Sequence, residues 1–319
     1  MGVQRQYTGT AGRIENSQVA VYLTYAAPRG HALIDRALYL PRSWAEDPDR
    51  CTDAGIPTDK QAFATKPTLA RELIDRTVAA DVPAAWVAGD EVYGAQPALR
   101  AAIRAHRLGY VLAIAANRFV PTEAGRLRVD RLPALLPPWA WQTHSAGAGS
   151  HGQRYYSWAW VELLAEDDTD TGRHYLLIRR NDTTAELAYL RCYTPRPTTL
   201  HTLVRVAGQR WRIEEAFQAA KGLVGLDQHQ VRRWTSWYRW TTLAMLAHAF
   251  LAVATAIERD TQPTPTGLIT LTVNEFRRLF DALLLVTKHT VTSLLAWSRW
   301  RRQHQHRARL SHYRRREHQ

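Results

Sequence analysis

One carboxylate stands at a position where many proteins place a reactive group. Asp90 directly follows the short apolar run Ala84–Gly89, which is typical of a strand. Carboxylates at the C-terminal ends of strands in α/β sheets commonly line the crevice in which ligands bind. An aspartate in this position also caps helices. Position alone therefore leaves Asp90 open as either a site carboxylate or a helix cap.

A second candidate group lies in the segment Arg210–Lys221. If this segment is helical, residues four and seven positions apart share a face, so Arg210, Glu214 and Lys221 form one polar stripe. The neighbouring apolar residues predict a face that packs on a sheet; they are Ile213, Ala216, Phe217 and Ala220. A solvated helix with ion pairs, each worth about 0.3–0.5 kcal/mol, explains the same spacing. The alternative is metal-assisted phosphodiester chemistry, in which Glu214 holds Mg²⁺ and the flanking cations, with Arg212, hold phosphates.

The charge of the chain favours a polyanionic partner. The 319 residues carry 42 Lys and Arg against 29 Asp and Glu, a formal net charge of +13. All but four of the basic residues are Arg, whose planar fork matches phosphate oxygens, although codon bias in a GC-rich genome explains the same excess. The segment Arg299–Gln319 holds eight Arg and one acid, which indicates nucleic acid.

Composition excludes several classes of protein. The hydrophobic fraction of 45% is too high for a disordered chain. Cys51 and Cys192 are too few for a disulfide framework and lack the spacing of a zinc site. The apolar run Thr241–Ile257 contains His248 and is shorter than the roughly 20 residues of a bilayer span, so we expect a buried helix and no membrane. Residues 1–10 lack the apolar segment of a signal peptide, which predicts a cytoplasmic protein.

The first third of the chain alternates strands and helices. The segments Gln18–Ala26 and His31–Leu40 predict a hairpin, because a Pro-Arg-Gly turn signal separates them. Further along, the patterns predict a helix at Lys66–Ala80, a buried parallel strand at Ala84–Gly89, a helix at Pro97–Arg107 and a buried strand at Tyr110–Ala116. This order is the pattern of a mixed α/β sheet.

Composition divides the chain into four parts: a first core part at 1–118, a β insertion at 119–197, a second core part at 198–260 and a C-terminal part at 261–319. The insertion has three strand-like runs, at Tyr155–Leu164, His174–Arg180 and Glu186–Tyr193. We expect a helix that is capped by Thr198 or Thr199 and continuous past Lys221. Further helices are expected at Trp237–Ile257 and Val273–Leu285, before the Arg-rich tail.

The segment Arg210–Glu215, followed by Lys221, closely resembles the signature of DDE transposases. In that signature an Arg is followed after three residues by the catalytic Glu and after six more by a Lys, as at Arg210, Glu214 and Lys221. Asp90 matches the second catalytic Asp. The likeness is to the 701-type insertion-sequence transposases, relatives of the transposon-five transposase, and it runs from Arg5–Gly9 to the Arg-rich tail.

The resemblance implies an α/β, RNase-H-like mixed sheet with helices, interrupted by an antiparallel β insertion and followed by a helical C-terminal region. It implies three catalytic carboxylates, two of them Asp90 and Glu214, which together hold two Mg²⁺ or Mn²⁺ ions about 3.5–4 Å apart. Arg210, Arg212 and Lys221 become DNA-binding residues. The implied reaction is strand cleavage at the ends of an insertion sequence, followed by strand transfer onto target DNA. The implied partner is DNA, as terminal inverted repeats and as target, with a homodimer on DNA as one arrangement.

Two positions depart from the family pattern. The signature has a Tyr three residues before Arg210, where this chain has Ala207. The family's first catalytic Asp lies upstream of the stretch that matches Arg5–Gly9, and no Asp precedes Asp35, which we interpret as an ordinary strand residue rather than a substitute. We therefore expect a truncated transposase that is inactive as written. The alternatives are a catalytically dead DNA-binding remnant and an unrelated RNase-H-like nuclease, which the Arg210–Lys221 signature disfavours.

Overall fold

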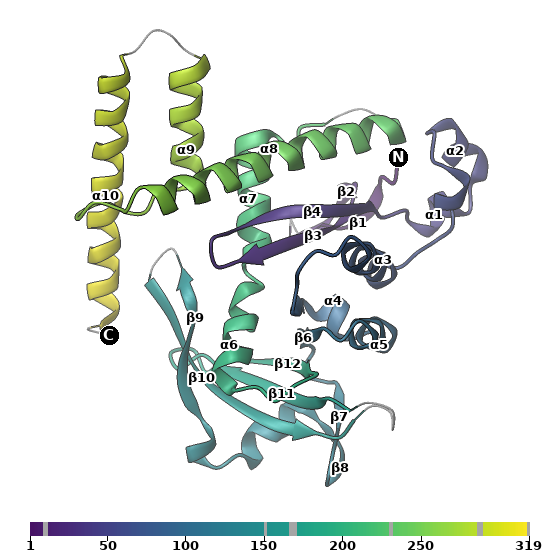
Figure 1. Cartoon of the computed structure of the whole chain (residues 1–319). Coiled ribbons are helices and arrows are strands. Elements are labelled where there is room, and N and C mark those ends of the chain that lie inside the picture. Colours follow the sequence, from purple (N-terminus) through teal and green to yellow (C-terminus); the bar gives the residue numbers. More distant parts are fainter. Residues whose placement is uncertain (9–11, 150–151, 166–170, 230–231, 286–289, 318–319) are drawn as a thin grey trace. The chain divides into compact units, whose positions relative to one another are not determined.

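The computed structural model describes residues 1–8, 12–149, 152–165, 171–229, 232–285 and 290–317 (Figure 1). Contacts within the chain define two compact units. The first unit consists mainly of Met1–Phe63 and Arg212–Gln319, and the second mainly of Ala64–Gly149 and Gln153–Trp211. Both units contain strands and helices. The six-stranded mixed sheet belongs to the second unit, and the C-terminal helices belong to the first. The expected mixed α/β class is confirmed, and the architecture is consistent with an RNase-H-like fold.

The second unit is built on a six-stranded sheet with the strand order β5-β6-β12-β11-β10-β9. Its strands are β5 (Trp86–Gly89), β6 (Gly109–Ile114), β9 (Gln142–Gly149), β10 (Gly152–Leu163), β11 (Arg173–Arg180) and β12 (Leu187–Thr194). Strand β5 runs parallel to β6, and β12 returns antiparallel beside β6. The three strands predicted for the insertion are therefore present, and they extend the same sheet that leads to Asp90.

Apolar side chains cover both faces of this sheet. On one face, Leu177 and Cys192 cluster with Leu203 and Val204 of helix α6 (Leu200–Gln209). On the other face lie Leu176 and Ile178, neighbours of Leu177 along the same strand. Successive residues of a strand point to opposite faces, so β11 is buried from both sides. The unit also contains α3 (Lys66–Ala79), α4 (Glu91–Gly94), α5 (Pro97–Ala105), β7 (Phe119–Thr122), β8 (Gly125–Arg128), η2 (Val129–Leu135) and η3 (Pro138–Ala140).

The first unit joins two hairpins to long helices. Its strands pair as β1 (Gln4–Thr8) with β2 (Arg13–Ser17) and β3 (Ala20–Ala27) with β4 (Gly30–Leu38). Its helices are α1 (Arg42–Ala45), α2 (Pro48–Asp53), η1 (Thr58–Lys60), α7 (Arg212–Val224), α8 (Trp234–Thr261), α9 (Val273–Phe280), the π-helical turn η4 (Asp281–Leu285) and α10 (Val291–Glu317).

The core of the first unit forms where α7 and α8 meet β4. Leu33 of β4 clusters with Ala216 and Ala220 of α7 and with Met245 of α8. Polar bonds fix the same contact, since the Arg36 guanidinium donates to the Thr241 hydroxyl and to the Tyr238 carbonyl oxygen, at 3.1 and 2.9 Å. This packing holds α7, which carries Glu214, on the hairpin.

Two expectations about the strands are wrong in part. The predicted hairpin exists, but β3 and β4 pair with each other alone among the described strands and do not join the sheet that contains β5. The strand before Asp90 is parallel to β6 as expected, yet it is half-buried or exposed along its length. The reason is its place at the end of the sheet, where one edge of β5 has no strand partner among the described residues.

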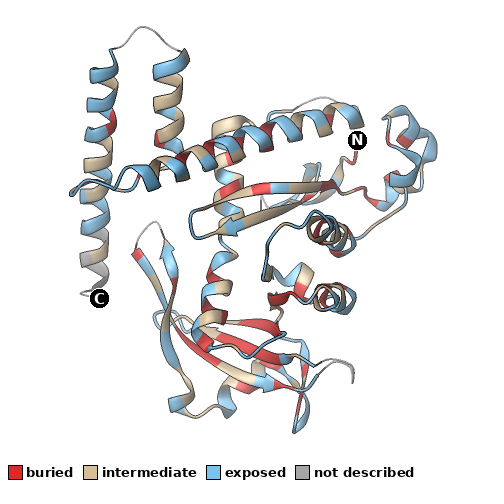
Figure 2. Cartoon of the chain, in the orientation of Figure 1, coloured by how far each residue is buried: buried red, intermediate tan, exposed pale blue. Residues whose placement is uncertain are grey.

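Helix α8 is the predicted apolar helix, but it is not buried all round. Figure 2 shows buried segments alternating with exposed ones along it. Its buried face includes Met245, His248 and Leu251 and contacts β4 and α7. By length and composition, α8 is the one helix within the described ranges that could cross a membrane. The buried face shows that it also serves as a core helix of the first unit.

Candidate active site

Asp90 ends β5 and begins α4, so it occupies both positions that the sequence left open. Its carboxylate oxygen Oδ1 accepts a hydrogen bond from the backbone N–H of Val92, at 2.9 Å. This is the geometry of a helix cap. The residue is exposed, and its second oxygen, Oδ2, makes no hydrogen bond with the described residues. Asp90 therefore caps α4 with one oxygen and presents the other to solvent.

The turn between β5 and α4, which carries Asp90, is fixed by contacts of its backbone with β6 and α5. Gly94, at the end of α4, lies so close to β6 that a Cβ atom there would overlap the carbonyl oxygen of Ala113. The carbonyl oxygen of Gly94 accepts a hydrogen bond from the buried Arg100 guanidinium, at 2.7 Å. Burial, and next the nearby charge of Asp90, raise the pKa of Tyr93 to about 12. A close glycine contact and a buried cation thus fix the backbone around the Asp90 carboxylate.

Glu214 lies on the outer face of α7. It is exposed and has no hydrogen bond or ion pair with the described residues. Lys221, seven residues further on, shares that face, and its ammonium group lies 5.8 Å from the centre of the Phe217 ring. The Phe217 ring packs edge-on against Tyr22 of β3, with ring centres 5.4 Å apart. The predicted apolar face of α7 is confirmed, and on the other side of the helix Glu214 is exposed and Lys221 is half-buried.

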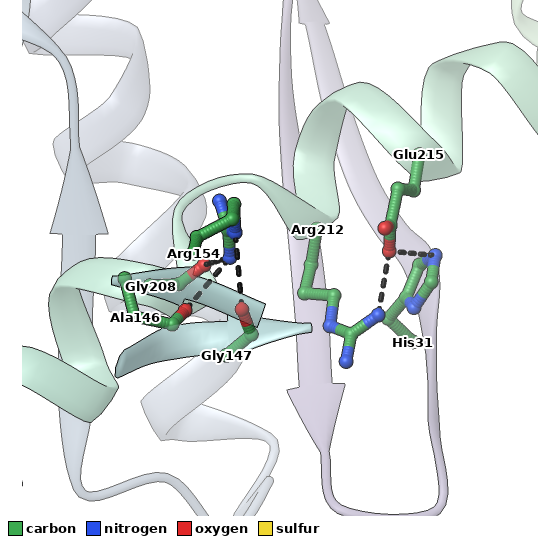
Figure 3. A network of polar contacts seen from close by, with 7 residues as sticks. All are labelled: His31, Ala146, Gly147, Arg154, Gly208, Arg212 and Glu215. Atoms are coloured by element: carbon green, nitrogen blue, oxygen red, sulfur yellow. Dashed lines mark hydrogen bonds and ion pairs between the residues drawn. The ribbon is translucent and has the colours of Figure 1, made fainter. Parts of the chain in front are cut away.

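Arg212 is held by a partner that the sequence did not suggest. Its guanidinium donates to Glu215 Oε2 at 2.6 Å, and His31 Nε2 of the β3–β4 hairpin lies 3.9 Å from the same oxygen (Figure 3). Burial lowers the pKa of His31, and the negative charge of Glu215 partly offsets this by raising it. Glu215 therefore sets the direction of Arg212, one of the predicted phosphate-binding residues.

Arg210 does not share the stripe that the sequence predicted. Helix α6 ends at Gln209 and α7 begins at Arg212, so the expected continuous helix is wrong at this point, and Arg210 belongs to the second unit. Thr199 caps α6, as one of the two proposed caps. A continuing helix would use the Gly208 carbonyl oxygen for the N–H of Arg212. That oxygen instead accepts hydrogen bonds from Trp211 N and from Arg154 of β10, at 3.4 and 3.3 Å.

Arg154 forms the second network in Figure 3. Its guanidinium also donates to the carbonyl oxygens of Ala146 and Gly147 in β9, at 2.7 and 3.3 Å. One side chain thereby ties the end of α6 to two sheet strands. This accounts for the helix break, because the Gly208 carbonyl oxygen near the end of α6 is satisfied from outside the helix.

The exposed carboxylates have the chemistry of ligands for a hard divalent cation. Mg²⁺ is bound in proteins by one or two carboxylates together with water and substrate phosphates. Asp90 and Glu214 each present unpaired carboxylate oxygen to solvent, the first from the second unit and the second from the first unit. Among the described residues no group of three His, Cys, Asp or Glu side chains is close enough to hold a metal ion. The donor atoms fit Mg²⁺ or Mn²⁺, but the set is smaller than the three carboxylates that the resemblance implies.

Asp35, which the sequence analysis considered as a substitute for the missing first catalytic Asp, hydrogen-bonds to the neighbouring backbone. Its carboxylate oxygen Oδ1 accepts a hydrogen bond from the backbone N–H of Arg36 at 2.8 Å. The side chain is half-buried in β4. Nothing in this geometry singles Asp35 out as a metal ligand.

Comparison with known proteins finds a family match for about the first half of the chain. Residues 1–158 match the family model of the DDE superfamily endonucleases, whereas no curated protein matches the chain. The match runs from β1 into β10 and includes Asp90, and it stops before Glu214. It supports a DDE transposase-type family and a transposase or endonuclease function acting on DNA. Endonucleases of this type generally use divalent metal ions.

Proposed function

We propose that this protein is a DDE transposase of the 701-type insertion-sequence family, which cleaves the terminal inverted repeats of its element and transfers the strands to target DNA. The observation that carries the proposal is Asp90, an exposed carboxylate at the end of β5 inside the stretch matched to DDE endonucleases. The Arg210–Lys221 signature adds Glu214 and the cations. A cytoplasmic location follows from the DNA substrate.

In this proposal Asp90 and Glu214 hold the divalent ions. When bound, Mg²⁺ or Mn²⁺ lowers the pKa of the attacking hydroxyl group and neutralises the leaving oxygen. The protein's own part is to direct the carboxylates. For Asp90 this is done by the cap to Val92 and by the Arg100 contact below it. Arg210, Arg212 and Lys221 bind phosphates, with Arg212 directed by Glu215.

A third carboxylate is needed for full activity, because two like-charged ions require a bridging ligand to stay close together. We propose that the 319 residues by themselves bind DNA and do not cut it. The alternative, a DNA-binding remnant, is favoured by the absence of a three-carboxylate group among the described residues.

The test combines DNA binding with DNA cleavage. A mobility-shift assay on the 319-residue protein should show salt-sensitive binding to DNA that carries the element ends, and a parallel assay with Mg²⁺ or Mn²⁺ should show no cutting. In a longer form that carries the third carboxylate, Asp90→Asn and Glu214→Gln should each abolish cutting while DNA binding is retained. Cutting by the 319 residues alone would refute the proposed inactivity. Unchanged cutting in Glu214→Gln would transfer the metal-binding role of Glu214 to Glu215.

The cations have their own test. Lys221→Ala should lower the slope of log affinity against log salt by roughly one unit, the effect of one lost phosphate contact. Lys60, an exposed lysine of η1 beside Asp59, provides the matched control, and Lys60→Ala should leave the slope unchanged. A slope that does not move in Lys221→Ala would leave this residue as a surface cation on Phe217.

A further inference from the structure

Helix α10 carries a row of ring side chains along one face. Trp297, Trp300, His304 and Arg307 are spaced three, four and three residues apart, so they share a face of the helix. Trp297 is 57% exposed and Trp300 is 47% exposed. The two indole rings meet edge to face with centres 5.2 Å apart, and the His304 ring centre lies 4.2 Å from that of Trp300. We call these four residues the α10 row.

The other side of α10 is fixed within the first unit. Glu275 of α9 is 3% exposed, and both of its carboxylate oxygens accept hydrogen bonds from the Arg301 guanidinium, one of them at 2.9 Å. Arg302 donates to the carbonyl oxygen of Ile269 at 3.0 Å, and Ser298 on the same side of the helix is buried. A two-pronged ion pair of this kind fixes orientation as well as position. It therefore holds the α10 row on the exposed side of the helix.

The charge around the α10 row is uniformly positive. No acidic residue lies between Val291 and Arg316. Arg301 and Arg302 are used in the contacts with the rest of the first unit, whereas Arg299, Arg307 and Arg309 are exposed. Exposed aromatic rings interleaved with cations are the combination by which proteins bind single-stranded nucleic acid, because the cations follow the phosphates and the ring faces stack on bases.

We propose that the α10 row is a binding surface for single-stranded DNA, with unpaired bases stacked on the two indole rings and Arg307 on a phosphate. A duplex offers the same phosphates, but its base faces are covered by neighbouring bases, so the indole rings would gain little from it. A helical protein partner would need an apolar seam over several turns, whereas this row ends in His304 and Arg307.

The inference rests on the proposed function in one respect, the choice of DNA as the nucleic acid. Cutting and transfer of strands separate nucleotides from their complementary strand, and the α10 row would hold such nucleotides by their bases. Binding of a single strand requires neither the element ends nor a metal ion. It can therefore be measured apart from cutting, and the two proposals can fail independently.

The experiment measures the binding of a fluorescently labelled oligothymidylate to the 319-residue protein by anisotropy, without divalent metal. Trp297→Ala and Trp300→Ala should each weaken binding about tenfold, the effect of one lost base stack. Trp300→Phe should retain most of the affinity, because it keeps a ring at that position. Trp139→Ala is the matched control and should bind like the wild type, since Trp139 is 82% exposed but lies in η3 of the second unit. Circular dichroism checks that each variant is folded.

Salt dependence separates the stacking residues from the phosphate contact. Arg307→Ala should lower the slope of log affinity against log salt by about 0.7, the effect of one lost phosphate contact on a single strand. Trp300→Ala should weaken binding without changing this slope, because stacking releases no counterions. A reduced slope in Trp300→Ala would show that the substitution displaces cations, and would contradict the stacking role.

Three other results would overturn the proposal. The first is wild-type affinity for oligothymidylate in both alanine variants of the tryptophans. The second is an equal loss of affinity for a blunt duplex of the same length, which would make the α10 row a duplex-binding surface. The third is tighter binding of oligouridylate than of oligothymidylate, which would assign the row to RNA. Absence of cutting in a longer form that carries the third carboxylate would instead refute the proposed function and leave the stacking surface in place.

Discussion

The two carboxylates of the candidate site are held in different ways. Asp90 stands on a corner fixed by polar contacts to the backbone: its own cap to Val92 N and the Arg100 bond to the Gly94 carbonyl oxygen. Glu214 stands on a helix fixed by apolar packing, and its own carboxylate contributes none of it. Asp90 therefore stabilises the fold as well as being a candidate catalytic residue. The fold around Glu214, in contrast, does not depend on the Glu214 side chain.

The support of α7 has one weak point, the buried histidine of α8. His248 is 1% exposed, and its Nδ1 atom has no hydrogen-bond partner among the described residues. Burial, and next the proximity of His31, lower the pKa of His248 to about 4. An uncharged imidazole fits this site and a charged one does not. The apolar support of α7 should therefore be sensitive to acid.

The largest expected effect is acid destabilisation of the first unit. Between pH 6.5 and 4 the imidazole of His248 is protonated in the unfolded chain but not in the folded chain. Its contribution to the free energy of unfolding is therefore fully present above pH 6.5 and is lost as the pH falls toward 4. The expected loss is about 3 kcal/mol. Urea unfolding of the wild type and of His248→Met at pH 7 and pH 4.5 measures it. Equal acid losses in both proteins would contradict the assignment to His248.

The next effect should appear at the Asp90 corner. Arg100→Ala leaves the buried Gly94 carbonyl oxygen without its donor, which should lower the free energy of unfolding by about 2–3 kcal/mol. Arg71→Ala, which removes an exposed pairing with Asp75 on α3, should change it by less than about 0.5 kcal/mol. Thermal unfolding followed by circular dichroism compares the two. Similar small losses would show that the corner does not depend on Arg100.

Substitutions of the two carboxylates should differ in their effect on the free energy of unfolding. Asp90→Ala removes the cap of α4 and should cost about 1 kcal/mol, whereas Asp90→Asn keeps an acceptor for Val92 N and should cost a few tenths. Glu214→Gln should stay within about 0.5 kcal/mol of the wild type, because the side chain is exposed and unpaired with the described residues. Chemical denaturation of the three variants decides. A large loss in Glu214→Gln would remove the contrast between the two positions.

The smallest effect should come from the pair beside Glu214. Glu215→Gln weakens the bond to Arg212 and removes the charge that opposes the lowered pKa of His31. The pair is partly exposed, so the free energy of unfolding should fall by only about 0.3–0.5 kcal/mol. The His31 pKa, followed by NMR titration, should fall further in the variant. A His31 pKa that rises would show that Glu215 is not its charge partner.

Local rules were enough to locate the elements around Asp90. The apolar run before it, the Pro at the start of Pro97–Ala105 and the apolar strand Gly109–Ile114 all depend on neighbouring residues, and each element is present. The three strands of the insertion and the apolar face of α7 were predictable for the same reason. Strand β9 had no such signal, because its sequence, Gln142–Gly149, is rich in small and polar residues.

What the sequence by itself determined is the chemistry available: Asp90 at a strand end, Glu214 and Lys221 seven residues apart, and a charge of +13 suited to DNA. The tertiary structure decided what no local pattern contains. Arg154 of β10 takes the carbonyl oxygen of Gly208 and ends α6, which separates Arg210 from Glu214. His31 meets Glu215 from another element, and α8 turns only one of its two apolar faces inward. Periodicity reports that a face is apolar, but only the packing of distant segments determines whether that face is covered.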